Sequence, residues 1–311
     1  MTKGGSRESL GRVNRIRREE IRLRYREESP GSGLEPYVEC FWYLADDGGS
    51  GPRPLERLLP IGSIEVVLHH RSAFREWPGG AAPRTLDRGV VAGQMTGPLY
   101  VQPAGPVETM GIRFRPGGAY PFFGARLEEL TDRIIGFSDV WGSEGARLEE
   151  RLLAARSDPE RVEIAEEFLL RRLASGRRDE RVEAVAGEIR RQRGLASVSD
   201  LARSSGLSAR QLERRFAAAL GLPPKILCRV VRFQSLVRGL SRRASPDWAA
   251  LASDFGFFDQ AHLINEVRRL SGLTPRGLVE RRSAAASREP GFTLDAASGL
   301  RACPATEPAV V

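Results

Sequence analysis

Cationic and amide side chains cluster within one short segment of the C-terminal third. Arg210, Gln211, Arg214 and Arg215 fall within six residues, and helical periodicity places them opposite the apolar positions of the same segment. A guanidinium carries several N–H donors and a permanent charge, and a glutamine amide both donates and accepts hydrogen bonds. This chemistry suits recognition of a polyanion such as nucleic acid.

The residues around this cluster carry the signals of two short helices joined by a tight turn. Ser197 and Asp200 predict a capped start of the first helix, and Gly206 predicts its end, because glycine readily adopts a left-handed conformation. Ser208 and Gln211 form a capping-box pattern at the start of the second helix. That helix is predicted to bury Leu212, Phe216 and Leu220. Helix, glycine turn and helix is the layout of a helix-turn-helix unit.

The same order of signals repeats in residues 247–270. An apolar run that starts at Trp248 predicts a first helix, and Gly256 predicts a turn 50 residues after Gly206. The second helix of this unit is predicted to bury Leu263, Val267 and Leu270. A repeated supersecondary unit is a more specific signal than either unit alone.

Residues 223–240, between the two units, predict a long helix. Pro223 and Pro224 suit its first turn. Apolar residues cover much of its circumference, at Ile226, Leu227, Val230, Val231, Phe233, Leu236, Val237 and Leu240. A helix with so wide an apolar band is buried on several sides. We therefore expect this helix to be a rigid spacer that fixes the distance and the relative orientation of the two units.

Positive charge is concentrated around these units. Residues 196–282 contain 15 Lys or Arg and 7 Asp or Glu, a net charge of +8, whereas residues 21–195 have a net charge of −2. A near-neutral region joined to a basic segment indicates two separate functions. The partner of the basic segment is then a polyanion. The alternative is a solvated basic surface without such a partner.

Four motifs in this region carry a family resemblance. They are LARSSGLSARQLERRFAAALGLPPK at 201–225, RFQ at 232–234, LASDFGFFDQAHL at 251–263 and GLTPRGL at 272–278. Through them, residues 195–282 resemble the DNA-binding domain of AraC/XylS-family transcription regulators. The N-terminal part, through RLLPIGSIEVVL, VAGQMTGPLYVQPAGP, GIRFRPGGAYPFFG and ELTDRIIGFSDVWG, is similar to an uncharacterised β-rich domain often found before such domains.

The resemblance implies a sequence-specific regulator with two helix-turn-helix units in successive major grooves of double-stranded DNA. Arg pairs with guanine, and Gln or Asn with adenine, with about 1–3 kcal/mol of discrimination per bidentate pair. Carried over position by position, the contacts to bases or phosphates are Arg210, Gln211, Arg214, Gln260, His262 and Asn265. Phosphate contacts, which add affinity without sequence choice, are expected from Arg215, Lys225, Arg229, Arg268 and Arg269.

The second unit departs from the family pattern. Phe258 stands where a small capping residue is usual, so Asp259 is expected to cap the helix. Leu263 and Val267 replace the usual phenylalanines and leave a smaller buried volume, and Asn265 replaces a common arginine. We therefore expect the second unit to be the weaker reader.

The predicted fold class is an α+β multidomain protein. Short apolar runs cut by Gly and Pro predict a β-rich N-terminal domain, for which a cupin-like barrel is one option. A helical linker and an all-α C-terminal domain follow, the latter with two helix-turn-helix units joined by a central helix. The expected boundaries are a flexible basic arm at 1–20, the β-rich domain at 21–125, the linker at 126–194, the DNA-binding domain at 195–282 and a disordered tail at 283–311.

The β-rich domain is expected to sense or to dimerise, because in this family such domains bind a small effector, dimerise or do both. The expected partners are therefore DNA, a small-molecule effector, a second copy of the chain and RNA polymerase. Arg113 and Arg115 either hold an anionic ligand or face solvent. Nine aromatic residues either line a pocket or pack in the core: Phe41, Trp42, Tyr43, Trp77, Tyr100, Phe114, Tyr120, Phe122 and Phe123.

An enzyme or metal-binding domain fused to a DNA-binding domain is the alternative function. His69 and His70 are adjacent, so on a strand they point to opposite faces, with Glu65 the one nearby carboxylate. The three cysteines, Cys40, Cys228 and Cys303, lack metal-site spacing, and no P-loop, G-x-G-x-x-G or Ser-His-Asp signature occurs. We expect no catalysis, metal or cofactor.

Two further expectations concern location and ligand. No apolar stretch is long enough to span a membrane, and the first residues are too rich in Arg and Glu for a secretory signal, so a cytoplasmic protein is expected. A third hypothesis is a regulator that needs no ligand and responds only to a protein partner.

Overall fold

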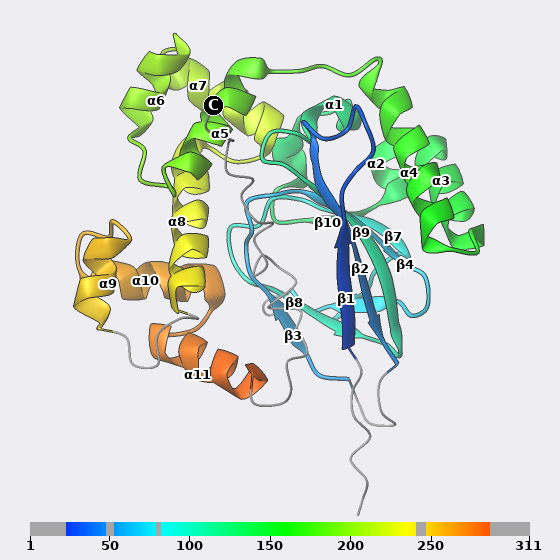
Figure 1. Cartoon of the computed structure of the whole chain (residues 1–311), viewed down its shortest axis with the longest axis horizontal. Helices are drawn as coiled ribbons and strands as arrows, with labels where there is room; N and C mark the ends of the chain where they lie inside the picture. Colours follow the sequence, from blue (N-terminus) through cyan, green and yellow to red (C-terminus); the bar gives the residue numbers. More distant parts are fainter. Residues whose placement is uncertain (1–22, 48–52, 79–81, 241–246, 287–311) are drawn as a thin grey trace, which may run out of the picture.

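The β-rich N-terminal region and the helical C-terminal region predicted from the sequence are both present (Figure 1). The computed structural model describes residues 23–47, 53–78, 82–240 and 247–286. The predicted arm at 1–20 and the tail from 287 onward lie outside the described residues. No helix within the described ranges is both long and apolar enough to cross a lipid bilayer.

Two antiparallel sheets build the N-terminal region. The larger has the order β1-β2-β9-β4-β7-β10, and the smaller the order β3-β8-β5-β6. The strands of the larger sheet are β1 (Leu23–Glu28), β2 (Val38–Asp46), β9 (Val107–Phe114), β4 (Glu65–His69), β7 (Gly89–Ala92) and β10 (Ile134–Gly136). The smaller sheet contains β3 (Glu56–Leu58), β8 (Leu99–Pro103), β5 (Phe74–Glu76) and β6 (Arg84–Thr85). Since β10 ends at Gly136, the sheet continues past the predicted boundary at residue 125.

The larger sheet is buried on both faces, as the central strand β2 shows. Phe41 and Tyr43 pack on one face against helices, and Trp42 and Leu44 face the smaller sheet on the other. Burial of one large apolar side chain contributes about 1.5–3 kcal/mol, so both faces stabilise the fold. The prediction that aromatic residues pack in the core is confirmed for Phe41, Tyr43, Phe114, Phe122 and Phe123.

Helices that follow the sheet cover its outer face. They are α1 (Tyr120–Phe123), the 3-10 helix η1 (Leu127–Leu130), α2 (Phe137–Trp141), α3 (Ser143–Ala154) and α4 (Asp158–Leu173). Phe137, Trp141, Leu148 and Phe168 belong to the same buried cluster as Phe41. Most of the predicted linker is therefore part of the core of the N-terminal region.

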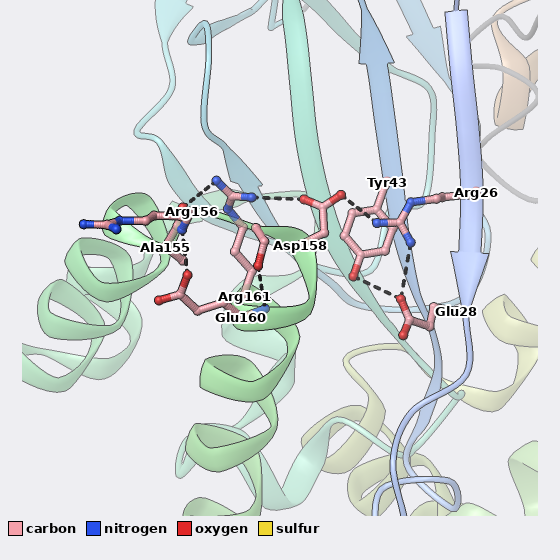
Figure 2. Close-up of polar contacts among 9 residues, drawn as sticks. Arg26, Glu28, Tyr43, Ala155, Arg156, Asp158, Glu160 and Arg161 are labelled. Carbon is pink, nitrogen blue, oxygen red and sulfur yellow. Dashed lines mark hydrogen bonds and ion pairs between the residues drawn. The ribbon is translucent and has the colours of Figure 1, made fainter.

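Ion pairs fix the start of α4 against the edge strand β1 (Figure 2). Arg26 Nη2 lies 2.6 Å from Asp158 Oδ2, and Asp158 Oδ1 accepts from Arg161 Nη1 at 3.0 Å. The Arg26 guanidinium also stacks over the Tyr43 ring, 3.6 Å from its centroid. Partly exposed pairs of this kind contribute about 0–1 kcal/mol each, so they set the position of α4 more than its stability.

The C-terminal region consists of helices arranged around α8 (Figure 1). They are α5 (Glu180–Arg191), α6 (Val198–Ser205), α7 (Ala209–Leu220), α8 (Pro224–Leu240), α9 (Trp248–Asp254), α10 (Gln260–Ser271) and α11 (Pro275–Ala286). Leu227 and Val231 of α8 pack with α5, α6 and α7, whereas Val230 and Phe233 pack with α9 and α10. The prediction that this helix is buried on several sides is confirmed. Helix α11 extends past residue 282, the predicted end of the DNA-binding domain.

Candidate nucleic-acid interface

The turn between α6 and α7 follows the sequence signals closely. Gly206 closes α6 with a φ of 66°, and Ser208 caps α7. The Gln211 N–H donates to Ser208 Oγ at 3.2 Å, and the Ser208 N–H donates to Gln211 Oε1 at 3.0 Å. The predicted capping box is confirmed, and it fixes the direction in which α7 leaves the turn.

The predicted cap at the start of α6 is wrong. Ser197 occupies the cap position, but its side chain caps no N–H of the helix. Ser197 Oγ instead lies 2.6 Å from Ser199 Oγ, and Asp200 pairs with Arg203 at 3.0 Å. Nearby hydroxyl and guanidinium partners compete successfully with the backbone for both side chains.

One face of α7 is buried and the opposite face is exposed. Arg210, Gln211 and Arg214 lie on the exposed face. The buried face consists of Leu212, Phe216 and Leu220. The capping box occupies Gln211 Oε1, which has a second lone pair, and the exposed amide NH₂ can still donate. The structure thus presents two arginines and one amide in the first turns of α7.

Arg215, predicted as a phosphate contact, is paired within the protein. Its Nε and Nη2 lie 2.7 and 2.8 Å from the two carboxylate oxygens of Asp179. Asp179 also caps α5 by accepting from the Val182 N–H at 3.2 Å. The hydrogen bond with Asp179 raises the pKa of Arg215. This fork-shaped pair joins α7 to the start of α5, so the structure gives Arg215 a positioning role.

The turn between α9 and α10 uses a different cap. Gly256 has a φ of 67° and allows the chain to turn. Asp259 caps α10 by accepting from the His262 N–H at 2.7 Å. The expectation that Asp259 replaces the usual cap is therefore confirmed.

His262 completes this cap from the other side. Its Nδ1 lies 3.2 Å from the Phe258 N–H, and its ring meets Phe257 edge-on at 5.6 Å. Because Nδ1 accepts a hydrogen bond, the proton of the neutral ring is on Nε2. The half-exposed His262 is therefore a hydrogen-bond donor at the start of α10.

The remaining predicted residues of the second pair lie on the exposed face of α10. Gln260 and Asn265 occupy its first two turns, and Arg268 and Arg269 its last. Leu263, Val267 and Leu270 are buried on the opposite face. The N-terminal half of α10 thus presents uncharged polar groups, and its C-terminal half presents cations.

Two cations of α8 have different surroundings. Lys225 is exposed in the first turn. Arg229 is half-buried. Its Nε lies 2.6 Å from Oε2 of Glu266 on α10, and its Nη2 lies 2.6 Å from Oε1 of the same carboxylate. This second fork-shaped pair fixes α10 to α8 and occupies a guanidinium that was predicted to bind phosphate.

Phe258, whose place in the sequence indicated only a departure from the usual cap, is an exposed residue. Its side chain is 92% exposed, immediately before α10. The sequence carried a signal, since a large aromatic residue stood where a capping residue was expected. This exposed apolar ring lies two residues before Gln260, the first residue of α10.

The two adjacent histidines lie far from this face. His69 is buried and shares a hydrogen bond with Thr109 Oγ1 at 3.1 Å, and burial lowers its pKa to about 3. His70 is half-buried. Cys40 and Cys228 are buried free thiols, and Cys303 lies outside the described residues. No group of three potential metal ligands occurs in the part of the chain that the structure describes.

Two families match separate parts of the chain. Residues 26–136 match a domain of unknown function, DUF6597, and residues 201–281 match a helix-turn-helix domain. Residues 201–281 form an AraC-type helix-turn-helix domain. The AraC-type domain contains both helix pairs and α8, and it places the chain among DNA-binding transcription regulators. The resemblance seen in the sequence is confirmed.

Comparison with whole proteins gives distant similarity. No curated protein matches the chain. A structure of ToxT from Vibrio cholerae at 1.65 Å resolution has 9% identity and a TM-score of 0.40, and covers 84% of this chain and 98% of that one. ToxT bound to an unsaturated fatty acid has 7% identity and a TM-score of 0.38, with 73% and 92% covered.

Proposed function

We propose that the chain is a sequence-specific transcription regulator whose two helix pairs are helix-turn-helix units reading successive major grooves. The observation that carries this proposal is the shared helix α8, which packs in the cores of both pairs. Its 17 residues make it about 26 Å long. Successive major grooves on one face of DNA are about 34 Å apart, so a rigid element of this length suits the spacing.

The two units are proposed to read different base pairs. Recognition helices contact base edges mainly through their N-terminal residues. Arg210 and Arg214 suit guanine, with Gln211 beside them. Gln260 and Asn265 suit adenine, and the Nε2 proton of His262 suits an acceptor such as guanine N7 or a phosphate oxygen.

Phosphate contacts are proposed for the exposed cations Lys225, Arg268 and Arg269. Arg215 and Arg229 are each engaged by a carboxylate, so we assign them to holding helices in place. This division predicts that the first group sets the salt dependence of binding and the second does not.

The β-rich region is proposed to modulate DNA binding through its contacts with the AraC-type domain. Thr131 Oγ1 donates to the Gly221 carbonyl, at the end of α7, at 2.5 Å. Gln234 Nε2 of α8 donates to the Pro60 carbonyl, and Leu59 packs in the same apolar cluster as α8 and α10. A small-molecule effector is the proposed signal. A homodimer, contact with RNA polymerase and a cytoplasmic location remain predictions from the sequence.

The test is genome-wide binding followed by footprinting on the recovered sites. Two protected segments about 10–10.5 base pairs apart are expected. Arg214→Ala should weaken protection of one segment and Gln260→Ala that of the other, by about 1–3 kcal/mol each. Arg151→Ala, which removes an exposed cation of α3, is the matched control. Binding no stronger than to random DNA, or two variants indistinguishable from the control, would refute the proposal.

A further inference from the structure

A cavity of about 110 Å³ lies between the two sheets of the β-rich region. Its walls are mostly aliphatic, with Trp42 and Phe74 as the aromatic members. Trp42 lies flat against Gly111 of the neighbouring strand, where any side chain would collide with its ring. A cavity of about 150 Å³ lined by apolar side chains holds benzene, so this smaller one suits a molecule of at most about one ring.

The charged end of the cavity is already neutralised. Glu65 Oε1 accepts from Trp42 Nε1 at 3.0 Å and from Arg113 Nε at 2.9 Å, and Arg113 Nη1 lies 3.4 Å from Glu27. Arg113 is 6% exposed. Burial alone would lower the pKa of Arg113, but Glu65 raises it, so the guanidinium stays charged. Among the described residues lining the cavity, Arg113 is the single cation, and its charge is balanced by carboxylates.

The opposite end of the cavity is uncharged. His69 stacks on Phe74 with ring centroids 4.3 Å apart and shares a hydrogen bond with Thr109. Its pKa is lowered to about 3 by burial, so it is neutral near pH 7. An anionic ligand would therefore find no uncompensated positive charge, whereas Glu65 Oε2 accepts no hydrogen bond from the described residues and can receive one from a ligand.

Two segments of the cavity wall also touch the AraC-type domain. The first includes Leu59 and Ile61, which line the cavity, and Pro60 between them accepts from Gln234 of α8. The chain therefore faces the cavity and the central helix within three residues.

The second segment runs from Gly93 to Leu99, with Met95 also in the cavity wall. A Cβ at Gly221, which ends α7, would lie 3.2 Å from Gln94 Cγ, and a Cβ at Gly97 would lie 3.7 Å from the Arg269 carbonyl of α10. This segment therefore approaches the ends of both recognition helices.

We propose that the cavity binds a neutral, mainly apolar molecule of about one ring that donates an O–H or N–H hydrogen bond to Glu65. Occupancy changes the position of the two wall segments and, through Gln234 and the ends of α7 and α10, the affinity for DNA. The second half of this proposal rests on the proposed function; the first half does not.

Calorimetry on the full chain tests the ligand class with matched probes. Phenol should bind saturably, whereas benzoate, benzylamine and the larger 2-naphthol should bind at least tenfold more weakly. Val67→Phe, which places a ring in the cavity, should abolish phenol binding, and Leu55→Phe at an exposed position should not. Benzoate binding as tightly as phenol, or no binding of phenol, would overturn the proposal.

A variant that removes one charge sharpens the same test. Glu65→Gln keeps the shape of the side chain and removes the nearer of the two carboxylate charges that balance Arg113. The preference should then move at least tenfold from phenol towards benzoate. An unchanged preference would show that Glu65 and Arg113 do not select the ligand.

The coupling is tested by fluorescence anisotropy with a recovered DNA site, with and without saturating phenol. The affinity of the wild-type chain should change at least threefold, and Gln234→Ala should reduce that change while phenol binding persists. Phenol binding with an unaltered DNA affinity would overturn the coupling alone. A chain that binds phenol but no DNA site would refute the proposed function and leave the ligand assignment standing.

Discussion

The two helix pairs share one layout and differ in how they are built. The α6–α7 pair starts its second helix with the Ser208–Gln211 capping box and buries Phe216. The α9–α10 pair starts its second helix with Asp259 and His262 and buries Val267 at the corresponding place. A glycine with positive φ makes the turn in both pairs, so the backbone is common and the side chains carry the difference.

The exposed faces differ in the same way. Arg210 and Arg214 place charge in the first half of α7, whereas the first half of α10 offers Gln260, His262 and Asn265. Charge gives affinity that falls with salt, and uncharged hydrogen bonds give base choice with little of that affinity. On the proposed function, we therefore expect the first pair to supply most of the binding strength and the second to refine the choice of site.

The largest expected contrast lies in the cores of the two pairs. Phe216→Ala should lower the free energy of unfolding by about 3–5 kcal/mol, and Val267→Ala by about 1.5–3 kcal/mol, since the aromatic ring leaves the larger cavity. Urea unfolding of both variants measures the difference. Glu213→Ala, exposed on α7, should stay within about 0.5 kcal/mol of wild type. A larger loss of stability for Val267→Ala than for Phe216→Ala would show that the second pair has the tighter core.

Local signals in the sequence were sufficient for the turns and for α8. Gly206, the Ser208–Gln211 box and the wide apolar band of α8 each depend on residues close together in the chain, and each is found as predicted. The Ser197 cap failed because Ser199, two residues away, offered a competing partner. Local patterns predict where a helix begins better than which side chain satisfies it.

Contacts between distant residues could not be predicted. Arg215 looked like one more exposed cation because Asp179, its partner, stands 36 residues earlier in a segment predicted as linker. Strand β10 has three residues and pairs with β7, more than 40 residues earlier. Neither pairing produces a periodic pattern in the sequence. The predicted boundary between the β-rich domain and the linker, at residue 125, therefore lies before the last strand of the sheet.

Restoring a charge to the second pair should reduce the difference between the two pairs. Asn265→Arg adds a cation on the exposed face of α10, where the family commonly has one. The slope of log affinity against log salt should steepen by about 0.9. When the salt concentration falls from 1 M to 0.1 M, the affinity of the variant should therefore rise about eightfold more than that of the wild-type chain. Filter binding over a salt series measures the slope, with Asn265→Gln as the uncharged control. An unchanged slope would place Asn265 away from the phosphates.

The exposed ring of Phe258 should give the second pair a contact that the first pair lacks. An aromatic side chain beside base edges can pack on the thymine methyl group. Phe258→Ser should weaken binding about fivefold, or about 1 kcal/mol for roughly one methyl-sized contact, without changing the salt slope. Replacing thymine by uracil in the site should weaken the wild-type chain and leave the variant unaffected. Equal weakening of both chains would mean that Phe258 does not read the methyl group.

The smallest expected effect distinguishes a structural arginine from a phosphate contact. Arg215 and Asp179 are partly exposed, so a double-mutant cycle on stability should give a coupling of about 0.2–1 kcal/mol. Asp179→Ala should cost about 1 kcal/mol more than Arg215→Ala, because it also removes the cap of α5. In DNA binding, Arg215→Ala should leave the salt slope unchanged, whereas Lys225→Ala should reduce it by about 1. If Arg215→Ala reduced the salt slope as much as Lys225→Ala does, Arg215 would have to leave Asp179 when DNA binds. The first pair would then gain a cation for phosphate binding, whereas Arg229, beside the second pair, would still be held by Glu266.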